Sequence, residues 1–488
     1  MRTQPETQRR LWHMIVDRYD PVNLSELIPE LRLEMEPELA ALDRLLYDDE
    51  LFLGVKADLS RRRPNSDRLG RRSTPVEVIL RMLVVRRLYD WSFEATERNV
   101  SDSLVLRQFC RLYLEAAPDD TTLIRWANLI GPRTLERLNE RAVSLALERK
   151  VTRGRKLRTD GTVVETDVSY PTDSSLLEDG ARVLGRLMGK AKEILGASGE
   201  KFRNRTRSAK RLARTIAEGA RRRRGEEASK EASKEASKEA SKEASKEAYY
   251  ERLIGVARAG LKQATKVRQM LRSEAATRRG EGLADELERF EGLIERVVDQ
   301  TERRVLKGES VAAGEKLVSL FEEHTSIIRR GKAGKETEFG RKVWLDEVEG
   351  GIVTGYRVLE GNPADEKQLL ASLENHLRLF GRPPRLVAAD RGVYSAANEQ
   401  AARKMGVQRV ALPKKGSKNE ERQRHERQGW FRRARRFRTG IEGRISVMKR
   451  RGYLGRCRDK GEEGFGRWVG WGVLTSNLHA IARAEAAR

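Results

Sequence analysis

The chain has 488 residues, too many for one ordinary hydrophobic core, so roughly two or three domains are expected. Lys and Arg number 99 against 74 Asp and Glu, a formal net charge of +25, which favours nucleic acid as a partner over an anionic membrane surface, since the apolar stretches fall short of the roughly 20 residues that span a bilayer. Two cysteines, Cys110 and Cys457, and five scattered His exclude a disulfide framework and a zinc site built on Cys or His, so any metal is expected to be a hard ion held by carboxylates.

Residues 1–150 predict an all-helical N-terminal domain. Thr74 is expected to cap a helix that has Pro75 at its first position and Glu77 at its third. Apolar residues follow at helical spacing from Val76 to Val84. Starts for further short helices lie at Ser92, Ser101 and Asp120.

Basic residues interrupt the apolar positions of this N-terminal region. The arginines concerned are Arg81, Arg86, Arg87, Arg98 and Arg107. Short helices with this pattern fit a helix-turn-helix-like DNA reader, and they fit equally a plain helical bundle with a solvated basic face.

The periodicity changes after residue 150 to an alternation of strands and helices. Residues 155–170, RKLRTDGTVVETDVSY, predict one or two strands. The later elements are a hairpin at 339–359 that turns at EGG, a helix at 365–380, a strand at 385–389, a helix at 396–405 and a strand at 407–412. This order predicts an α/β fold with a mixed sheet.

A long helical insertion separates the first strand from the hairpin. It contains the unit EASK five times over, at residues 227–246, where each Glu faces a Lys three residues on. Nothing larger than Ala is apolar there, so this piece is expected to be a solvated spacer without chemistry of its own. The predicted domains are therefore 1–150, a first catalytic part at 151–177, the insertion at 178–329 and the rest of the catalytic domain at 330–488.

Three acidic residues stand out by their context. Asp160 lies in or just after the first strand, and Asp390 follows the strand RLVAA, where α/β sheets place reactive groups, although a strand-end Asp is often only a cap or turn residue. Glu442 lies in a basic stretch, with Arg438 four residues before it and Lys449 seven after it, so the three share a helix face. Rival acids are Glu165, Asp167 and Asp173 for the first position, and Asp346 or Glu347 elsewhere.

Such a set of acids suits metal-dependent phosphodiester chemistry. Two metal ions about 4 Å apart activate the attacking oxygen and stabilise the leaving one. Carboxylates crowded together without a metal would repel one another. We therefore expect Asp160, Asp390 and Glu442 to bind two Mg²⁺ ions, with Mn²⁺ as a substitute.

On these residues the sequence resembles the insertion-sequence DDE transposases, which have a ribonuclease-H-like catalytic domain. The tail signature of that family is Tyr, two residues, Arg, three residues, Glu, six residues, Lys. Arg438, Glu442 and Lys449 match it, whereas Arg435 stands at the Tyr position. Asp160 in DGT and Asp390 in ADRG look like the first two acids of the family. Residues 73–112 and 471–482 resemble its helical N-terminal domain and its closing segment.

The resemblance implies cut-and-paste transposition. The enzyme would bind the terminal inverted repeats of its element in double-stranded DNA, hydrolyse the element ends with magnesium, and transfer the strands into target DNA. It also implies a homodimer in the synaptic complex, a cytoplasmic, nucleoid-associated location and no membrane. The implied fold is an α/β ribonuclease-H-like mixed sheet, interrupted by the helical insertion and preceded by the all-helical domain.

Several residues near Glu442 are expected to contact DNA. Backbone phosphates are the expected partners of Arg422, Arg424, Arg427, Arg432, Arg433, Arg435, Arg438 and Lys449. Trp430 and Phe431 would stack on an unpaired base near the cleaved end, or else be ordinary core residues. Two alternative functions stay open: a related metal-dependent DNA nuclease without strand transfer, and a catalytically inactive transposase-derived repressor.

Overall fold

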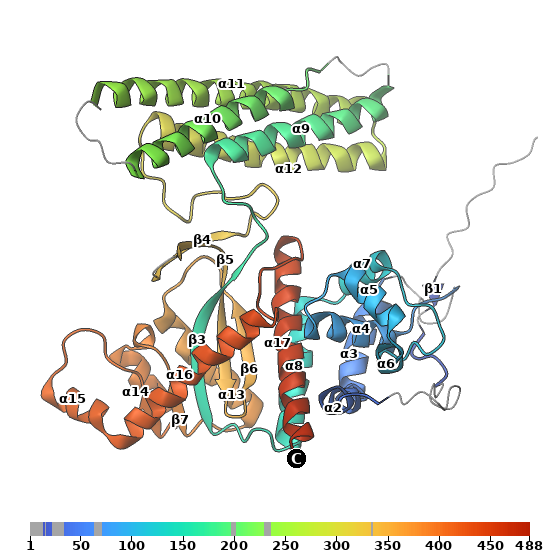
Figure 1. Cartoon of the computed structure of the whole chain (residues 1–488), viewed down its shortest axis with the longest axis vertical. Coiled ribbons are helices and arrows are strands. Elements are labelled where there is room, and N and C mark those ends of the chain that lie inside the picture. Colours follow the sequence, from blue (N-terminus) through green and yellow to red (C-terminus); the bar gives the residue numbers. More distant parts are fainter. Residues whose placement is uncertain are drawn as a thin grey trace, which may run out of the picture. The chain divides into compact units, whose positions relative to one another are not determined.

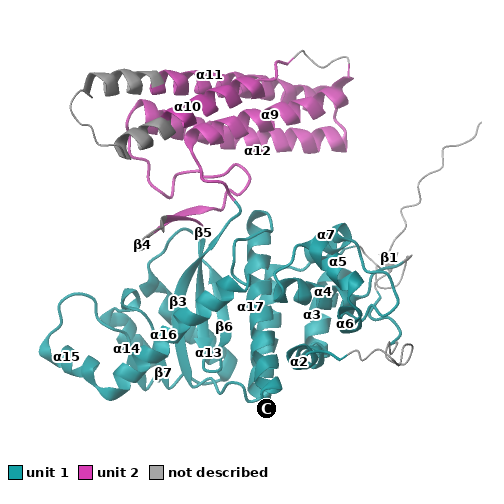
Figure 2. Cartoon of the chain, in the orientation of Figure 1, with its two compact units in different colours: residues 1–167, 341–488 teal, residues 168–340 magenta. Residues whose placement is uncertain are grey.

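The computed structural model describes residues 13–14, 16–21, 34–62, 71–196, 202–228, 236–332 and 335–488. Contacts divide the chain into two compact units, coloured separately in Figure 2. The first unit comprises residues 1–167 and 341–488, and the second comprises residues 168–340. The second unit covers the predicted insertion. The N-terminal helices belong to the same unit as the sheet, and their separation as a domain stays a prediction.

Short helices make up the N-terminal part of the first unit (Figure 1). They are α2 (Pro37–Leu45), α3 (Asp49–Ser60), α4 (Val76–Leu88), α5 (Phe93–Asp102), α6 (Leu104–Phe109), α7 (Asp120–Ala127) and α8 (Pro132–Glu148), with the short strands β1 (His13–Met14) and β2 (Arg71–Arg72) paired in parallel.

The structure confirms one predicted helix start and shifts three. The Ser92 side chain caps α5 by accepting from the amide of Ala95. Helix α4 begins one residue later than predicted, because Pro75 is the cap residue and makes no side-chain cap bond. The caps of α6 and α7 are Ser103 and Asp119 in place of the predicted Ser101 and Asp120.

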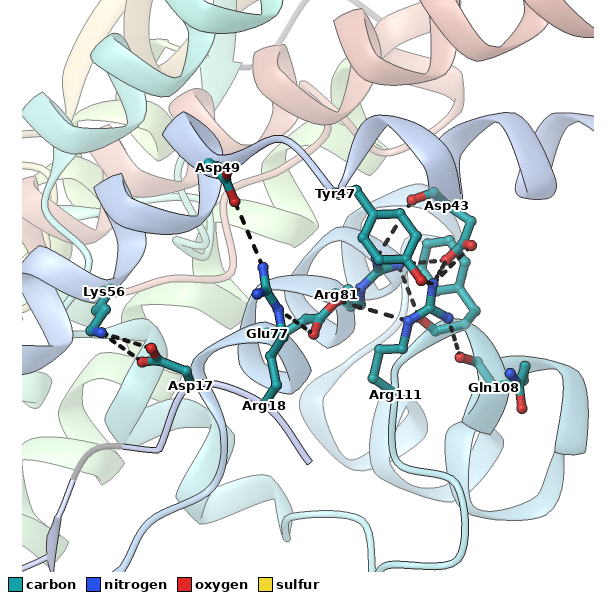
Figure 3. Close-up of polar contacts among 11 residues, drawn as sticks. Asp17, Arg18, Asp43, Tyr47, Asp49, Lys56, Glu77, Arg81, Gln108 and Arg111 are labelled. Carbon is teal, nitrogen blue, oxygen red and sulfur yellow. Dashed lines mark hydrogen bonds and ion pairs between the residues drawn. The ribbon is translucent and has the colours of Figure 1, made fainter. Parts of the chain in front are cut away.

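The arginines of α4 do not form the basic surface that the sequence suggested. Arg81 is fully buried, and its guanidinium bonds Glu77 at 3.0 Å and Asp43 at 2.6 Å (Figure 3). Arg111 joins the same carboxylate of Asp43 at 2.8 Å. Both proposals for this face, a DNA reader and a solvated bundle face, are therefore wrong for Arg81, and equally for Arg86 and Arg87, which are also buried.

The sheet of the first unit is mixed, as predicted. Along the sheet, β5 lies beside β3, followed by β7 and β8, and β6 pairs with β5. Strands β3, β7 and β8 are parallel, whereas β5 and β6 form an antiparallel hairpin. The bounds are β3 (Lys156–Glu165), β5 (Lys335–Val348), β6 (Ile352–Val358), β7 (Leu386–Ala388) and β8 (Arg409–Ala411). The hairpin turns at Gly350 and Gly351, whose φ angles of 87° and 74° favour glycine.

Helices pack on this sheet and close the unit. They are η3 (Asp365–Gln368), α13 (Leu369–Phe380), η4 (Arg391–Val393), α14 (Ala396–Lys404), α15 (Glu420–Arg427), α16 (Gly429–Arg450) and α17 (Gly461–Ala486). Helix α16 packs on β7 and β8 through Phe431 and Ala434, which meet Ala388 and Ala411. Helix α17 is buried on most sides against α2, α4, α8 and β6 (Figure 1). No helix in the part of the chain that the structure describes is long and apolar enough to cross a membrane.

The second unit is a bundle of long helices with its own apolar core. Its elements are α9 (Asp173–Leu195), α10 (Thr206–Ala228), α11 (Ala236–Glu274), α12 (Arg278–Thr301), the π-helical turn η2 (Glu302–Leu306) and strand β4 (Ser326–Lys332), which pairs with the first part of β5. Residues 229–235 of the EASK repeat lie outside the described residues, and its remaining residues belong to α10 and α11.

A buried histidine makes the stability of the first unit depend on pH. His376 on α13 is fully buried, lies 3.1 Å from the carbonyl oxygen of Gly154 through Nε2, and stacks on Phe380. Burial lowers the pKa of His376 to about 4. His376 takes up a proton near pH 6.5 in the unfolded chain but only near pH 4 in the folded chain. Its contribution to the free energy of unfolding is therefore complete above pH 6.5 and is lost as the pH falls from 6.5 to 4.

We expect the free energy of unfolding to fall by about 3 kcal/mol across this range from His376 alone. Urea unfolding at several pH values measures the loss. The variant His376→Gln should lack this component, and an unchanged pH dependence in that variant would contradict the assignment.

Candidate active site

The three acids expected to act together come from three elements of the first unit. Asp160 is the fifth residue of β3, and Asp390 follows β7 at the N-cap position of η4, where its side chain makes no cap hydrogen bond. Glu442 lies on α16, which packs against both strands. Strands β3 and β7 are parallel neighbours in which Arg158 lies opposite Ala388, so Asp160 and Asp390, each two residues further on, lie at the same level along the sheet.

The guanidinium of Arg438 joins the three acids. Its Nη2 lies 3.1 Å from an oxygen of Asp160 and 3.9 Å from an oxygen of Asp390, and its Nη1 lies 2.5 Å from an oxygen of Glu442. The Arg438 side chain is 17% exposed, Asp160 is 19% exposed, and the other two acids are about half exposed. The three carboxylates are therefore accessible to solvent, and they share the less exposed Arg438 as their ion-pair partner.

The donor atoms at this site, carboxylate oxygens, are the type that a hard divalent cation prefers, but their present spacing is not that of a metal site. Three carboxylates face one positively charged group, and the Asp160 carboxylate is already oriented, since its second oxygen accepts from the amide of Gly161 at 2.8 Å. In the present arrangement of the described side chains, no group of three or more His, Cys, Asp or Glu is close enough to hold a metal ion, and this includes the acids around Arg438.

The rival acids have partners away from Arg438. Glu165 and Asp167 pair with Arg456 at 3.5 Å and 3.6 Å. Asp173 belongs to the second unit, where it pairs with Arg304 at 2.7 Å. The fully buried Asp346 and Glu347 pair with Arg357 and Arg158.

The remaining predicted residues divide between the surface and the interior. Arg432, Arg433 and Arg435 are exposed on α16, and Lys449, Arg438 and Trp430 are partly buried. Phe431 is fully buried against Ala388 and Ala411, so a base-stacking role for it is wrong.

Arg422 is also an internal residue. It pairs with Glu399 at 2.7 Å and with Glu426 at 2.9 Å, and it donates to the carbonyl oxygen of Leu412. The expected phosphate contact of Arg422 is therefore wrong, whereas Arg424 and Arg427 are exposed on α15.

Sequence reasoning missed the buried ionic group that Arg158, Glu347 and Arg444 form near the three acids. Arg158 on β3 binds Glu347 on β5, and Arg444 on α16 lies close enough to affect the same carboxyl. Burial raises the pKa of Glu347 and lowers the pKa of Arg444. The available signal was the period of a strand, because Arg158 and Asp160 are two residues apart and share one face of β3.

Two family models match the chain. The transposase domain DUF772 matches residues 26–129, and the transposase DDE domain matches residues 296–487. The second match contains Asp390 and Glu442, and Asp160 lies between the two matched segments. Neither the curated proteins nor the solved structures yield a significant match. The two domain matches identify the chain as a member of the insertion-sequence DDE transposases.

Proposed function

We propose that this protein is a DNA transposase that binds the terminal inverted repeats of its element, hydrolyses phosphodiester bonds at their ends and transfers the strands into target DNA. The observation that supports this most directly is the pairing of Arg438 with Asp160, Asp390 and Glu442. Acids from β3, from the end of β7 and from α16, more than 50 residues apart in sequence, pair with this one arginine.

Divalent metal ions are general cofactors of DDE transposases. Asp160, Asp390 and Glu442 would hold two Mg²⁺ ions, for which Mn²⁺ could substitute, and these would supply Lewis-acid stabilisation of the phosphate and an activated oxygen nucleophile. Arg438 stands where it can exchange its carboxylate partners for a phosphate oxygen. The exposed Arg432, Arg433 and Arg435 of α16 extend this positive charge for the DNA backbone, with Lys449 on the same helix. Trp430, half-buried beside Phe431, is the proposed stacking residue for an unpaired base.

The proposal includes the finer architecture and the assembly. The mixed sheet would be a ribonuclease-H-like catalytic core formed by residues 151–177 and 330–488, interrupted by the helical insertion. Residues 1–150 would form a helical DNA-binding domain. Two copies of the chain would act together in the synaptic complex, on DNA in the cytoplasmic nucleoid.

A small basic cavity supports DNA contact by the N-terminal region. It has a volume of about 220 Å³ and is lined by Arg62, Arg72, Ser73, Thr74, Thr122, Arg125 and Trp126. Arg62 lies over the Trp126 ring, 5.2 Å from its centroid. Of the described residues, those lining the cavity include three arginines and three hydroxyls but no acid, which suits a backbone phosphate.

We expect Arg125→Ala to weaken DNA binding on every duplex alike and to reduce the slope of log affinity against log salt by about 1. Fluorescence anisotropy at several salt concentrations measures both effects. Arg133→Ala, an exposed arginine of α8 outside the cavity, is the matched control. Equal salt slopes for wild type and Arg125→Ala would exclude a phosphate contact there.

Cleavage of a linear duplex that carries the element ends, with and without Mg²⁺, tests the proposed function. Magnesium-dependent nicks at the repeat boundaries, followed by joining to a second duplex, are the expected result. Nicks without joining would identify a nuclease. Binding of the repeats without cleavage would identify a repressor and overturn the proposal.

A further inference from the structure

We propose that Arg158 and Glu347 form an anchoring pair that holds α16 against β3 and thereby sets the position of Glu442 and Arg438 relative to Asp160. The inference rests on the proposed function for its catalytic meaning. Arg158 and Glu347 act through β3 and α16, the elements that carry the acids, so both are positioning residues.

The anchoring pair connects two strands through a bidentate contact. The Nε and Nη2 of Arg158 donate to the two carboxylate oxygens of Glu347 at 2.8 Å and 2.7 Å. The Glu347 side chain is 1% exposed and that of Arg158 is 13% exposed, so water competes little for either charge. The parallel geometry of this contact fixes the orientation of the guanidinium plane.

The third nitrogen of Arg158 reaches the helix that carries Glu442. Nη1 donates to the backbone carbonyl oxygen of Phe437 on α16 at 2.6 Å, and the guanidinium lies over the Phe437 ring, 4.7 Å from its centroid. Phe437 directly precedes Arg438, and Arg158 precedes Asp160 by two residues. The Arg158 side chain therefore connects the backbone of α16 next to Arg438 with the strand that carries Asp160.

A glycine allows the helix to approach this closely. A Cβ at Gly440 would overlap Nη1 of Arg158 and lie 3.0 Å from its Cζ. Gly440 is helical, so its backbone does not need glycine, and in a helix interior it costs about 1 kcal/mol relative to alanine. The space it leaves is filled by Arg158, which gives this glycine a function in packing.

The same strand offers a matched control pair that does not touch α16. Asp346, the neighbour of Glu347, is also fully buried and pairs with Arg357 at 3.1 Å. Arg357 donates to the carbonyl oxygen of Gln368 and to Ser372, which belong to the η3–α13 segment. The acids of the two pairs are neighbours on β5 and are equally buried, each pair joins one acid to one arginine, and the pairs contact different helices.

The test compares Arg158→Lys and Gly440→Ala with the control Arg357→Lys. Lysine cannot make the bidentate contact and the carbonyl contact together, and alanine at position 440 displaces Arg158 while both charges remain. Mn²⁺ binding to the full-length protein, followed by the electron paramagnetic resonance of the free ion, should weaken about 10-fold in the two test variants. Arg357→Lys should leave Mn²⁺ affinity unchanged even if its melting temperature falls by as much as that of the two test variants.

Amide hydrogen exchange of residues 437–446 provides a readout that does not depend on metal. Exchange there should be faster in Arg158→Lys and in Gly440→Ala than in the wild type, and unaltered in Arg357→Lys. Unchanged exchange in both test variants, or equal acceleration in the control, would overturn the inference. Wild-type protein that binds no Mn²⁺ would overturn the proposed metal site instead, and hydrogen exchange would still decide whether the pair anchors α16.

Discussion

Asp390→Ala and Glu442→Ala should each reduce magnesium-dependent cleavage of the element ends by at least about 10³-fold, since a metal ligand contributes several kcal/mol to stabilisation of the transition state. Both acids are about half exposed and pair with Arg438, at 3.9 Å and 2.5 Å. Their removal takes no atom from the apolar core, so folding and repeat binding should persist. Gel-based cleavage and anisotropy on the same duplex measure the two properties separately.

The first acid is tested against one of its rivals, Asp167. Asp160→Asn should abolish cleavage as completely, whereas Asp167→Ala should retain it, because Asp167 is exposed and pairs with Arg456. The amide keeps the size of the Asp160 side chain and removes the charge that a metal ion requires. Cleavage that survives in Asp390→Ala and Glu442→Ala would mean that other acids carry the reaction.

Arg87→Met should destabilise the first unit by about 3 kcal/mol, the second large effect. Arg87 is 2% exposed, and its Nη2 donates to the backbone carbonyls of Gly452, Tyr453 and Trp468 at 3.2, 2.6 and 3.3 Å. Its Cζ lies 3.7 Å from the centroid of the Trp468 ring. Methionine fills much of the same volume, but it removes one donor from each of these carbonyls inside the protein.

Arg87 belongs to α4, but its guanidinium lies at the C-terminal end of α16, and this position explains the large effect. Gly452 follows the C-cap residue Arg451, so the guanidinium lies near the negative end of that helix dipole. Burial lowers the pKa of Arg87 to about 9, which still leaves it charged at neutral pH. Urea unfolding followed by tryptophan fluorescence measures the loss. Arg98→Met, an exposed arginine of α5, is the matched control, and equal stabilities of the two variants would contradict a structural role for Arg87.

Local sequence signals determined most of the secondary structure around the site. The run of residues 155–170, rich in Thr and Val and without a helical stripe, predicted β3, and the EGG turn and the apolar run RLVAA predicted the β5–β6 hairpin and β7. Helical spacing placed Arg438 and Glu442 on one face of α16, and the structure pairs them at 2.5 Å. These features depend on neighbours within about one helical turn or one hairpin, which is the range over which a sequence pattern acts directly.

The tertiary structure alone decided which charged residues face solvent. Arg81 and Arg87 look like a basic surface in sequence, yet both are buried, because Asp43 and the carbonyls at residues 452, 453 and 468 satisfy them from distant parts of the chain. Glu347 was one of the rival acids in the sequence, and its pairing with Arg158 places it in the interior. The sequence by itself thus determined the family, the strand and helix order and the acids to consider. Which of these acids share one cation depends on contacts between residues hundreds of positions apart, and no local pattern encodes their desolvation and pairing.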